Sequence, residues 1–267
     1  MRTFECMLTW VRHLPLLQRA NWLWDLIRPI YEGAINHFGR DGLERIINGS
    51  DRILVCPKAR SVSETYEPEV WRALMTEVRM GDTFVDVGAF IGLYTIAVAH
   101  RLGGSGRVIA FEPDGRNFSL LQEHVRLNRL ERSIELRRAA VSDKDGRSCF
   151  LADGSSEARL VSLDRKDAAL VDVVTLDRAF AGDRIDILKI DVEGYEEMVL
   201  RGAKSLLGSP TRPRAVFVEV HPYAWASLGT TGESLIGLLE NAGYRVETPR
   251  GYPINSIDGY GEIIAKT

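Results

Sequence analysis

Cysteine is scarce in this 267-residue sequence, which contains only Cys6, Cys56 and Cys149. The three residues are odd in number, lie far apart and lack the spacing of metal ligands. This distribution excludes a disulfide framework and a cysteine-rich zinc site. It is typical of free thiols in a reducing compartment, so we predict a cytoplasmic location.

Neither sign of charge dominates the sequence, which has 34 lysines and arginines against 37 aspartates and glutamates. The formal net charge of −3 provides no basic field of the kind that attracts nucleic acid. Hydrophobic residues make up 45% of the chain, which is enough for a packed core and excludes intrinsic disorder. We therefore expect a folded domain whose partner is a small molecule and not nucleic acid.

The sequence also lacks an apolar run of the ~20 residues that a transmembrane helix needs. Residues 7–31 are rich in leucine and tryptophan, but Arg12, Arg19 and Arg28 interrupt them, and there is no small-residue cleavage site. This pattern favours a pair of amphipathic helices within a segment that spans residues 1–60. These helices could cap the following domain or form a homodimer, and binding to a membrane surface is the alternative.

From residue 82 onward, the sequence contains an alternation of strand and helix patterns. Apolar, β-branched runs alternate with helical patterns of ten or more residues. This alternation predicts an α/β fold with a doubly wound, mostly parallel sheet. The expected strands are 82–89, 107–113, 133–142, 184–191 and 214–221, and the expected helices are 92–102, 117–128, 195–207 and 232–243.

Two parts of the chain depart from this alternation. The last two strand patterns, YRVETPR and GEIIAKT, leave no room for a helix between them, so they must be antiparallel. Residues 144–181 contain short strand patterns around a polar turn, which indicates an inserted hairpin or loop over one end of the sheet. We assign residues 61–267 to one domain that includes both parts.

A glycine turn, DVGAFIG, joins the first predicted strand to its helix. Ligands of open α/β sheets bind at the carboxyl ends of the strands, where this turn lies. Glu112, which precedes Pro113 at the end of the second predicted strand, could accept hydrogen bonds from both hydroxyls of a ribose. The turn and the carboxylate together indicate a nucleoside-binding site.

The spacing of the glycines distinguishes between two nucleoside cofactors. Dinucleotides are normally bound by G-x-G-x-x-G, whereas three residues separate Gly88 from Gly92 here. They include Ala89 and Phe90, whose side chains weaken a phosphate cradle. A cofactor without phosphates, such as S-adenosylmethionine, tolerates these side chains, and the carboxylate of Asp86 suits its ammonium group.

Several motifs follow one another in a specific order: YEPEVWRALM, DVGAFIG, VIAFEP, AVSD and ILKIDVEGYE. Together they resemble the FkbM family of S-adenosylmethionine-dependent methyltransferases, and the resemblance covers residues 62–245. It implies a class I methyltransferase, with a seven-stranded, Rossmann-like sheet. Because most characterised members methylate oxygen, it also implies an O-methyltransferase.

The resemblance implies a set of cofactor contacts, carried over by position in the motifs. They are Asp86, Gly88 and Gly92 around the methionine part, Glu112 at the ribose, Ser142 and Asp143 near the adenine, Tyr66 and Glu67 as a cover, and Ala89, Phe90 and Pro113 as further contacts. One position departs from the family, whose turn usually reads D-V-G-A-N-I-G. Phe90 replaces the asparagine, so an aromatic wall could take the place of a polar contact.

The motif ILKIDVEGYE places a lysine and several acids at the end of the fourth predicted strand. Buried charges are costly unless they are paired or used, and three interpretations remain open. In the first, Asp191 or His221 is the base and Lys189 orients a carboxylate. In the second, Asp191, Glu219 and His221 bind a divalent ion such as Mg²⁺. In the third, Lys189 and Glu193 form a structural ion pair.

These features together predict an S-adenosylmethionine-dependent O-methyltransferase that acts on a hydroxyl of a small molecule, such as a sugar or a natural product. One alternative is methylation of nitrogen or of a carboxylate on the same scaffold. The other is a non-catalytic module that binds the cofactor or a partner.

Overall fold

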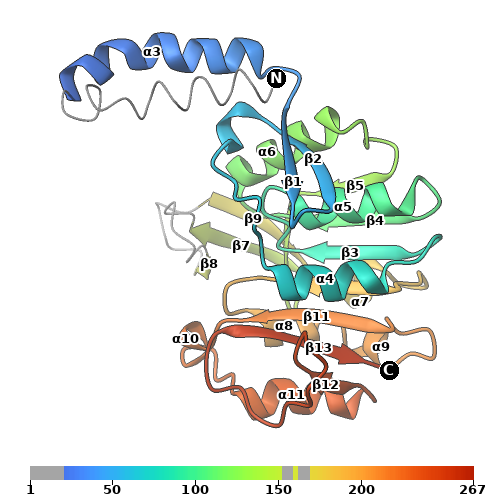
Figure 1. Cartoon of the computed structure of the whole chain (residues 1–267). Coiled ribbons are helices and arrows are strands. Elements are labelled where there is room, and N and C mark those ends of the chain that lie inside the picture. The colour runs from blue at the N-terminus through green and yellow to red at the C-terminus, as the bar shows by residue number, and fades with distance from the viewer. Residues whose placement is uncertain (1–20, 152–158, 162–168) are drawn as a thin grey trace.

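A computed structural model describes residues 21–151, 159–161 and 169–267. The strands of its central sheet are β3 (Thr83–Val87), β4 (Arg107–Phe111), β5 (Ile134–Arg137), β10 (Ile187–Ile190), β11 (Ala215–Val220), β12 (Arg245–Glu247) and β13 (Gly261–Lys266). The seven strands lie in the order β12-β13-β11-β10-β3-β4-β5 (Figure 1). Those from β11 to β5 are parallel, and β13 is antiparallel to both of its neighbours. The predicted mostly parallel sheet and its antiparallel C-terminal pair are therefore confirmed.

Helices cover both faces of this sheet (Figure 1). Alternate residues of a strand point to opposite faces, so Phe84 of β3 joins one hydrophobic core cluster and Val85 joins the other. The first cluster includes side chains from α4 (Pro68–Glu77), α5 (Leu93–Leu102) and α6 (Gly115–Leu127). The second includes side chains from α7 (Leu176–Ala179), α8 (Glu196–Arg201), α9 (Lys204–Leu207), α10 (Pro222–Trp225) and α11 (Gly232–Asn241).

A second, four-stranded sheet lies on the side of the molecule where the parallel strands end (Figure 1). Its strands, in spatial order, are β6 (Ala139–Val141), β9 (Ala169–Val174), β7 (Gly146–Leu151) and β8 (Arg159–Val161). The single strand predicted over residues 133–142 was wrong, because it divides at Arg138 into β5, which pairs with β4, and β6, which pairs with β9. The insertion is thus a small sheet and not one hairpin, and most of its predicted polar turn, 153–159, lies outside the described residues.

The single helix predicted over residues 195–207 was also wrong, because α8 ends at Arg201 and α9 begins at Lys204. The interruption lies where the chain passes close to the end of β6. A Cβ atom on Gly202 would lie 2.0 Å from the carbonyl oxygen of Ser142, so the position accepts only glycine without a shift of the backbone. The Gly202 carbonyl in turn accepts a hydrogen bond from the N–H of Asp177 at the start of α7.

The N-terminal segment is helical over only part of its predicted length. α3 (Asn21–Phe38) is followed by an antiparallel hairpin of β1 (Leu43–Ile47) and β2 (Asp51–Val55) and by a short 3-10 helix, η1 (Pro57–Ala59). The first of the two predicted amphipathic helices falls on residues 1–20, outside the described part of the chain. Asn48 and Gly49 form the hairpin turn with positive φ angles, and an Asn-Gly pair between apolar runs is a known hairpin signal.

The hairpin is packed into the core of the following domain. Fully buried Ile47, Ile53 and Val55 belong to the same hydrophobic cluster as the buried residues of α4 and α5. At the start of β2, Asp51 accepts hydrogen bonds from the indole of Trp71 (2.9 Å) and from Arg101 (2.9 and 3.0 Å). These contacts join the hairpin of β1 and β2 to α4 and α5.

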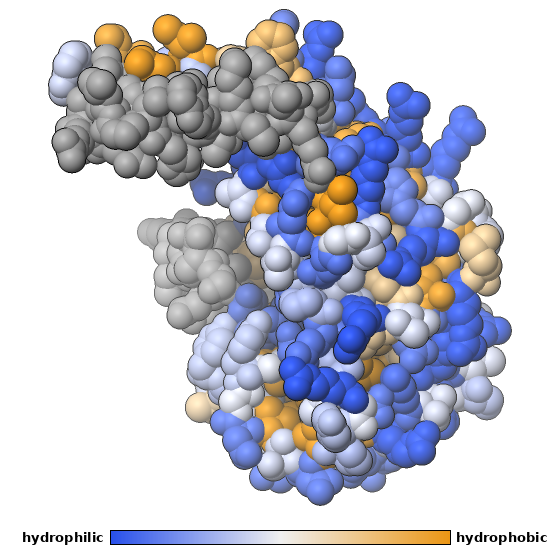
Figure 2. All heavy atoms as spheres, in the orientation of Figure 1, coloured by the Kyte–Doolittle hydropathy of each residue, from blue (hydrophilic) through white to orange (hydrophobic). Residues whose placement is uncertain are grey.

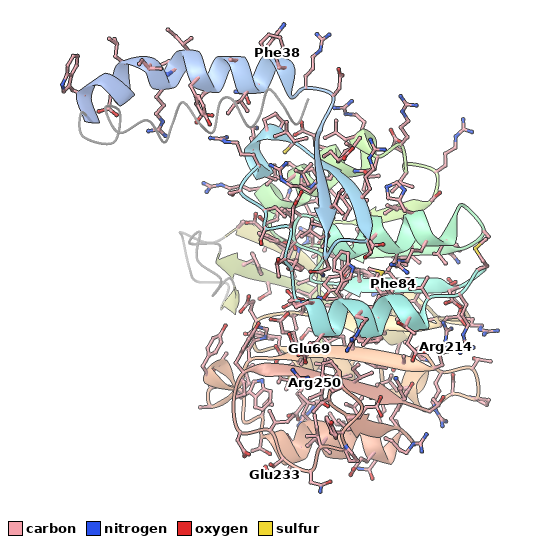
Figure 3. All side chains as sticks on the ribbon, in the orientation of Figure 1. Phe38, Glu69, Phe84, Arg214, Glu233 and Arg250 are labelled. Atoms are coloured by element: carbon pink, nitrogen blue, oxygen red, sulfur yellow. The ribbon has the colours of Figure 1, made fainter. Side chains whose placement is uncertain are left out.

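At the surface, α3 exposes apolar side chains that include Trp22, Leu26 and Ile30 (Figure 2). Within the part of the chain that the structure describes, every helix is too short or too polar to span a lipid bilayer. On another part of the surface, Glu69 of α4 pairs with Arg250 of the connection between β12 and β13 (Figure 3). This pair joins the C-terminal hairpin to the helix that precedes β3.

Candidate active site

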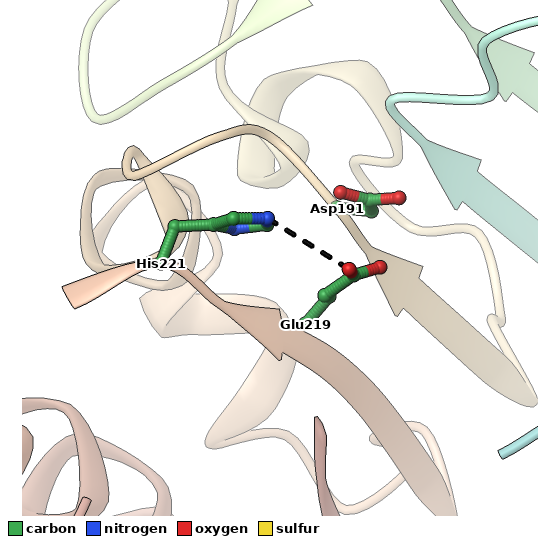
Figure 4. Close-up of side chains that lie close together, drawn as sticks. All are labelled: Asp191, Glu219 and His221. Carbon is green, nitrogen blue, oxygen red and sulfur yellow. Dashed lines mark ion pairs between the residues drawn. The ribbon is translucent and has the colours of Figure 1, made fainter. Parts of the chain in front are cut away.

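Three predicted side chains converge where β10 and β11 end (Figure 4). Asp191 follows β10, Glu219 lies near the end of β11, and His221 follows β11. One ligand atom from each lies within 4.8 Å of the others. The strand-tip positions inferred from the sequence therefore meet in space.

His221 is held in a buried network. Its Nδ1 atom lies 2.7 Å from Oε1 of Glu196, which is fully buried. That carboxylate also accepts hydrogen bonds from the indole N–H of Trp225 (2.8 Å) and from the backbone N–H of Gly194 (2.7 Å). Burial alone would lower the pKa of His221, but hydrogen bonding to Glu196 and the nearby carboxylates outweigh it and raise that pKa.

Sequence reasoning missed Glu196 because its position at the start of a predicted helix was itself a sufficient explanation for an acid. The available signal was the run of acids in VEGYEE, which is longer than a helix terminus needs.

Lys189 is buried between the sheet and the aromatic side chain of Tyr94. Its Nζ atom lies 3.2 Å from Oδ2 of Asp191 and 4.8 Å from the centre of the Tyr94 ring. Burial would lower the pKa of Lys189, but the charges of Asp191 and Asp86 raise it, so the ammonium is retained. The proposed ion pair with Glu193 was therefore wrong, and Glu193 instead accepts a hydrogen bond from the hydroxyl of Tyr223 (2.6 Å).

Glu219 faces an excess of negative charge. Burial and the repulsion from Asp191 raise the pKa of its carboxyl group to about 8. The hydroxyl of Tyr260 donates a hydrogen bond to Oε1 of the same carboxylate. Oε1 is also 3.8 Å from Nε2 of His221. The cluster would thus gain from any bound group that carries positive charge.

Both glycines of the predicted cofactor turn lie where any larger residue would clash with the rest of the chain. Gly88 has a φ of 82°, and a Cβ atom there would lie 1.7 Å from the carbonyl oxygen of Asp191. Gly92 has a φ of 86°, and a Cβ atom there would lie 2.3 Å from the side chain of Leu121. The N–H groups of Gly88 and Ala89 donate to the carbonyl of Phe111, which fixes the turn against the end of β4.

Phe90 and Glu112 connect the turn to the second strand tip. The backbone N–H of Phe90 donates to Oε2 of Glu112, and the N–H of Asp114, beyond Pro113, donates to Oε1, both at 2.8 Å. Burial raises the pKa of Glu112 to about 8. Phe90 has a left-handed backbone with a φ of 51°, and its ring is half exposed.

The carboxylate of Asp86 is buried beneath the turn. Its Oδ2 atom accepts a hydrogen bond from the hydroxyl of Thr95 (2.5 Å). Its Oδ1 atom has no hydrogen bond to the residues that the structure describes. Burial raises the pKa of Asp86, and Lys189 on the adjacent strand opposes this rise.

The remaining predicted contacts lie on two other elements. Ser142 is buried just after β6, and its hydroxyl lies 3.3 Å from Oδ1 of Asp143. Glu67 accepts a hydrogen bond from the hydroxyl of Tyr94 (2.8 Å), and the ring of Tyr66 packs edge-on against the same tyrosine at 6.0 Å. Tyr66 and Glu67 therefore adjoin the aromatic ring that faces Lys189.

Comparisons with solved structures find methyltransferases of low sequence identity. An FkbM methyltransferase from Methylobacillus flagellatus is 20% identical with a TM-score of 0.48, and the match covers 70% of this chain but only 44% of that protein. An S-adenosylmethionine-dependent O-methyltransferase from Thermotoga maritima is 15% identical with a TM-score of 0.45, with 79% and 68% of the two chains covered. An O-methyltransferase from Bacillus cereus in complex with SAH is 13% identical with a TM-score of 0.43, with 79% and 86% covered.

A comparison with curated proteins gives no match. The family model described as the methyltransferase FkbM domain matches residues 86–246. This range runs from Asp86 in β3 to Val246 in β12 and so contains the glycine turn, Glu112 and the cluster of Asp191, Glu219 and His221. Because the match takes in more than half of the 267 residues, the chain belongs to the FkbM methyltransferase family.

Proposed function

We propose that this protein is an S-adenosylmethionine-dependent O-methyltransferase whose acceptor is a hydroxyl group of a small molecule, such as a sugar or a natural product. The observation that supports it is the convergence of Asp191, Glu219 and His221 at the carboxyl edge of the sheet. The glycine turn is adjacent, since Gly88 packs directly against the backbone of Asp191. A donor held by the turn and a hydroxyl held by the three side chains would therefore meet.

The residues around the turn fit this cofactor. Oδ1 of Asp86 lacks a hydrogen bond within the described chain and can accept one from an ammonium group. The carboxylate of Glu112 accepts two backbone N–H groups and a side-chain hydrogen bond from Asn117, and it retains acceptor capacity for a ribose hydroxyl. S-Adenosylmethionine would supply a methyl group made electrophilic by its sulfonium sulfur.

The reaction forms an oxygen–carbon bond and breaks a carbon–sulfur bond, whose electron pair stays on sulfur, while the hydroxyl loses its proton. Asp191 is the better proton acceptor of the two candidates, because its carboxylate is partly exposed and Lys189 binds only one of its oxygens. His221 is poorer in this role. Although burial opposes protonation, Glu196 and the nearby carboxylates raise its pKa and favour the form that already carries the proton.

The experiment has a binding part and a turnover part. Isothermal titration with S-adenosylmethionine and with NADH should give binding of the first alone. The chain should then convert S-adenosylmethionine to S-adenosylhomocysteine with at least one member of a panel of sugars, phenols and other hydroxyl compounds. Asp191→Asn should lower turnover by about 10²–10⁴-fold, the usual contribution of a general base, and leave cofactor affinity nearly unchanged.

A matched control is Glu262→Gln, which removes a half-buried acid from β13 opposite Glu219 and outside the converging cluster. It should leave turnover close to that of the wild type. Binding of NADH in place of S-adenosylmethionine would refute the proposal. Cofactor binding without methylation of any hydroxyl compound, or with methylation of amines alone, would refute the assignment to hydroxyl acceptors.

A further inference from the structure

We propose that Asp191, Glu219 and His221 bind one divalent transition-metal ion, and that Glu196 positions the histidine for it. The binding of the ion stands on the geometry of these side chains alone. Its part in catalysis rests on the proposed methyl transfer to a hydroxyl.

The distances between the ligand atoms of Asp191, Glu219 and His221 allow one ion to contact all three side chains. Two ligands of one Zn²⁺ or similar ion, each at about 2.1 Å, lie at most about 4.2 Å apart. Nε2 of His221 and Oε1 of Glu219 are 3.8 Å apart, already within that limit. The full set lies within 4.8 Å, so a change of side-chain torsion on Asp191 or Glu219 completes the approach. Figure 4 shows all three side chains pointing toward one another.

The imidazole of His221 is an independent indication of a ligand. Its side chain is only 4% exposed, and Nδ1 is bound to Glu196. Nε2 points into the cluster and lies 3.4 Å from a carboxylate oxygen of Glu193 and 3.8 Å from one of Glu219. A buried imidazole whose second nitrogen faces several carboxylate oxygens suits a cation bound between them.

Glu196 completes an arrangement known from metal sites. Histidines that bind metals usually donate their other N–H to a carboxylate or carbonyl, which fixes the tautomer and leaves the metal-binding nitrogen unprotonated. An ion that displaces the proton of Nε2 would leave Nδ1–H donated to Glu196 and would meet the lone pair of Nε2 on the side of Asp191 and Glu219. The indole of Trp225 and the N–H of Gly194 hold the Glu196 carboxylate in place.

The charges around the cluster also favour a cation. Asp191, Glu193, Glu196 and Glu219 bring four carboxylates together, and Lys189 is the adjacent ammonium group. Of the two carboxylate oxygens of Asp191, Lys189 contacts only Oδ2. Oδ1 of Asp191 and the Glu219 carboxylate are therefore available to a second positive charge.

The ligand types indicate which ion is bound. Two carboxylates and one imidazole suit Mn²⁺, Fe²⁺ or Zn²⁺, whereas Mg²⁺ prefers an all-oxygen shell. The nitrogen ligand therefore argues for a transition metal in place of the Mg²⁺ considered from the sequence. An acceptor hydroxyl bound to such an ion would have a lowered pKa and would be held beside the glycine turn. In the metal-loaded site the ion, in place of Oδ1 of Asp191, would therefore promote loss of the hydroxyl proton.

The test is a titration of the metal-free full chain with Mn²⁺, in which the electron paramagnetic resonance signal of free Mn²⁺ reports how much of the ion stays unbound. We expect one Mn²⁺ per chain, displaced by Zn²⁺. Glu219→Gln and Asp191→Asn should abolish this binding, and Glu196→Gln should weaken it about 10–100-fold, as loss of a partner behind a metal-binding histidine does. Glu262→Gln removes the facing acid on β13 without removing a ligand, so it should bind Mn²⁺ like the wild type.

Thermal unfolding of each variant identifies those that are folded. Glu196 is fully buried, so Glu196→Gln could fail to fold, and Glu219→Gln then still tests the proposal. We expect Glu219→Gln to fold, because Glu219 lies near a strand end and keeps a partner in Tyr260. The proposal is overturned if the wild-type chain binds neither Mn²⁺ nor Zn²⁺. It is also overturned if Glu219→Gln and Glu262→Gln weaken binding equally, since that result indicates only a general negative field.

A parallel titration of the metal-free chain with S-adenosylmethionine separates this inference from the proposed function. Cofactor binding by a chain that binds no metal overturns the metal site alone. A chain that binds Mn²⁺ through Glu219 but no S-adenosylmethionine overturns the function and supports the metal site.

Discussion

Replacing Gly88 with alanine should damage both the fold and the site, because this glycine lies against the backbone that carries Asp191. Its φ of 82° is in the left-handed region, where a side chain costs about 1–2 kcal/mol. The added Cβ atom would also lie 1.7 Å from the carbonyl oxygen of Asp191, and relief of that overlap costs about 1–3 kcal/mol. The sum predicts a loss of about 2–5 kcal/mol in the free energy of unfolding.

Gly103 is the matched control for this substitution. It ends α5 with a φ of 56°, so alanine meets the same left-handed strain there, but no atom lies within 4 Å of the added Cβ. Gly103→Ala should therefore cost only about 1–2 kcal/mol. Thermal unfolding separates the two, since each kcal/mol corresponds to about 2–4 °C in a chain of this size.

The same pair of variants tests the site. If Gly88→Ala moves the backbone at Asp191, turnover should fall by more than the folded fraction of the variant explains, whereas Gly103→Ala should keep wild-type turnover per folded molecule. Equal losses of stability in the two variants would refute the steric argument. Wild-type turnover in folded Gly88→Ala would refute the link between the glycine turn and the tip of β10.

Three further predictions concern other parts of the chain. In urea unfolding, Phe90→Asn should be about 1 kcal/mol more stable than Phe90→Ala. Both variants lose the aromatic ring, but asparagine tolerates the left-handed backbone better than alanine does. Equal stabilities of the two variants would contradict this reasoning. The pKa of Glu112 is raised from 4.5 unfolded to about 8 folded, so its contribution favours folding below pH 4.5 and is lost as the pH rises toward 8. Glu112→Gln should therefore gain stability relative to the wild type between pH 5 and 8 in melting curves, and a relative loss would contradict the raised pKa. A fragment of residues 61–267 should lack the cooperative unfolding transition that the full chain shows in circular dichroism. It loses the buried side chains of Ile47, Ile53 and Val55, each of which contributes about 1.5–3 kcal/mol, whereas the free energy of unfolding of a whole domain is about 5–15 kcal/mol. Cooperative folding of the fragment would show that the hairpin is dispensable.

The central sheet could be predicted because its signals are local. Strands buried on both faces are continuous apolar runs, and the helices between them are long enough to force parallel crossovers. The final antiparallel pair followed from the absence of such a helix between YRVETPR and GEIIAKT. None of these inferences needed knowledge of a contact between distant residues.

The errors occur where a distant contact decides the local structure. The interruption between α8 and α9 depends on the approach of Gly202 to Ser142, which is 60 positions earlier in the chain. The division of the strand at Arg138 depends on β9, which begins at Ala169. The hairpin of residues 43–55 was the avoidable error, because Asn48-Gly49 between two apolar runs is a local signal.

The lysine of ILKIDVEGYE shows how much of the site the sequence could have settled. Side chains two positions apart in extended backbone lie on the same face, and Asp191 directly follows the strand, so Lys189 was always closer to Asp191 than to Glu193, which lies farther beyond the strand end. In the observed register Lys189 also lies directly opposite Asp86 on β3. The charge of the ammonium thus acts on an acid beneath the glycine turn as well as on an acid of the converging cluster. The pairing with Asp191 could be predicted from strand geometry alone, whereas the position opposite Asp86 required the strand order and register, which only the folded chain provides.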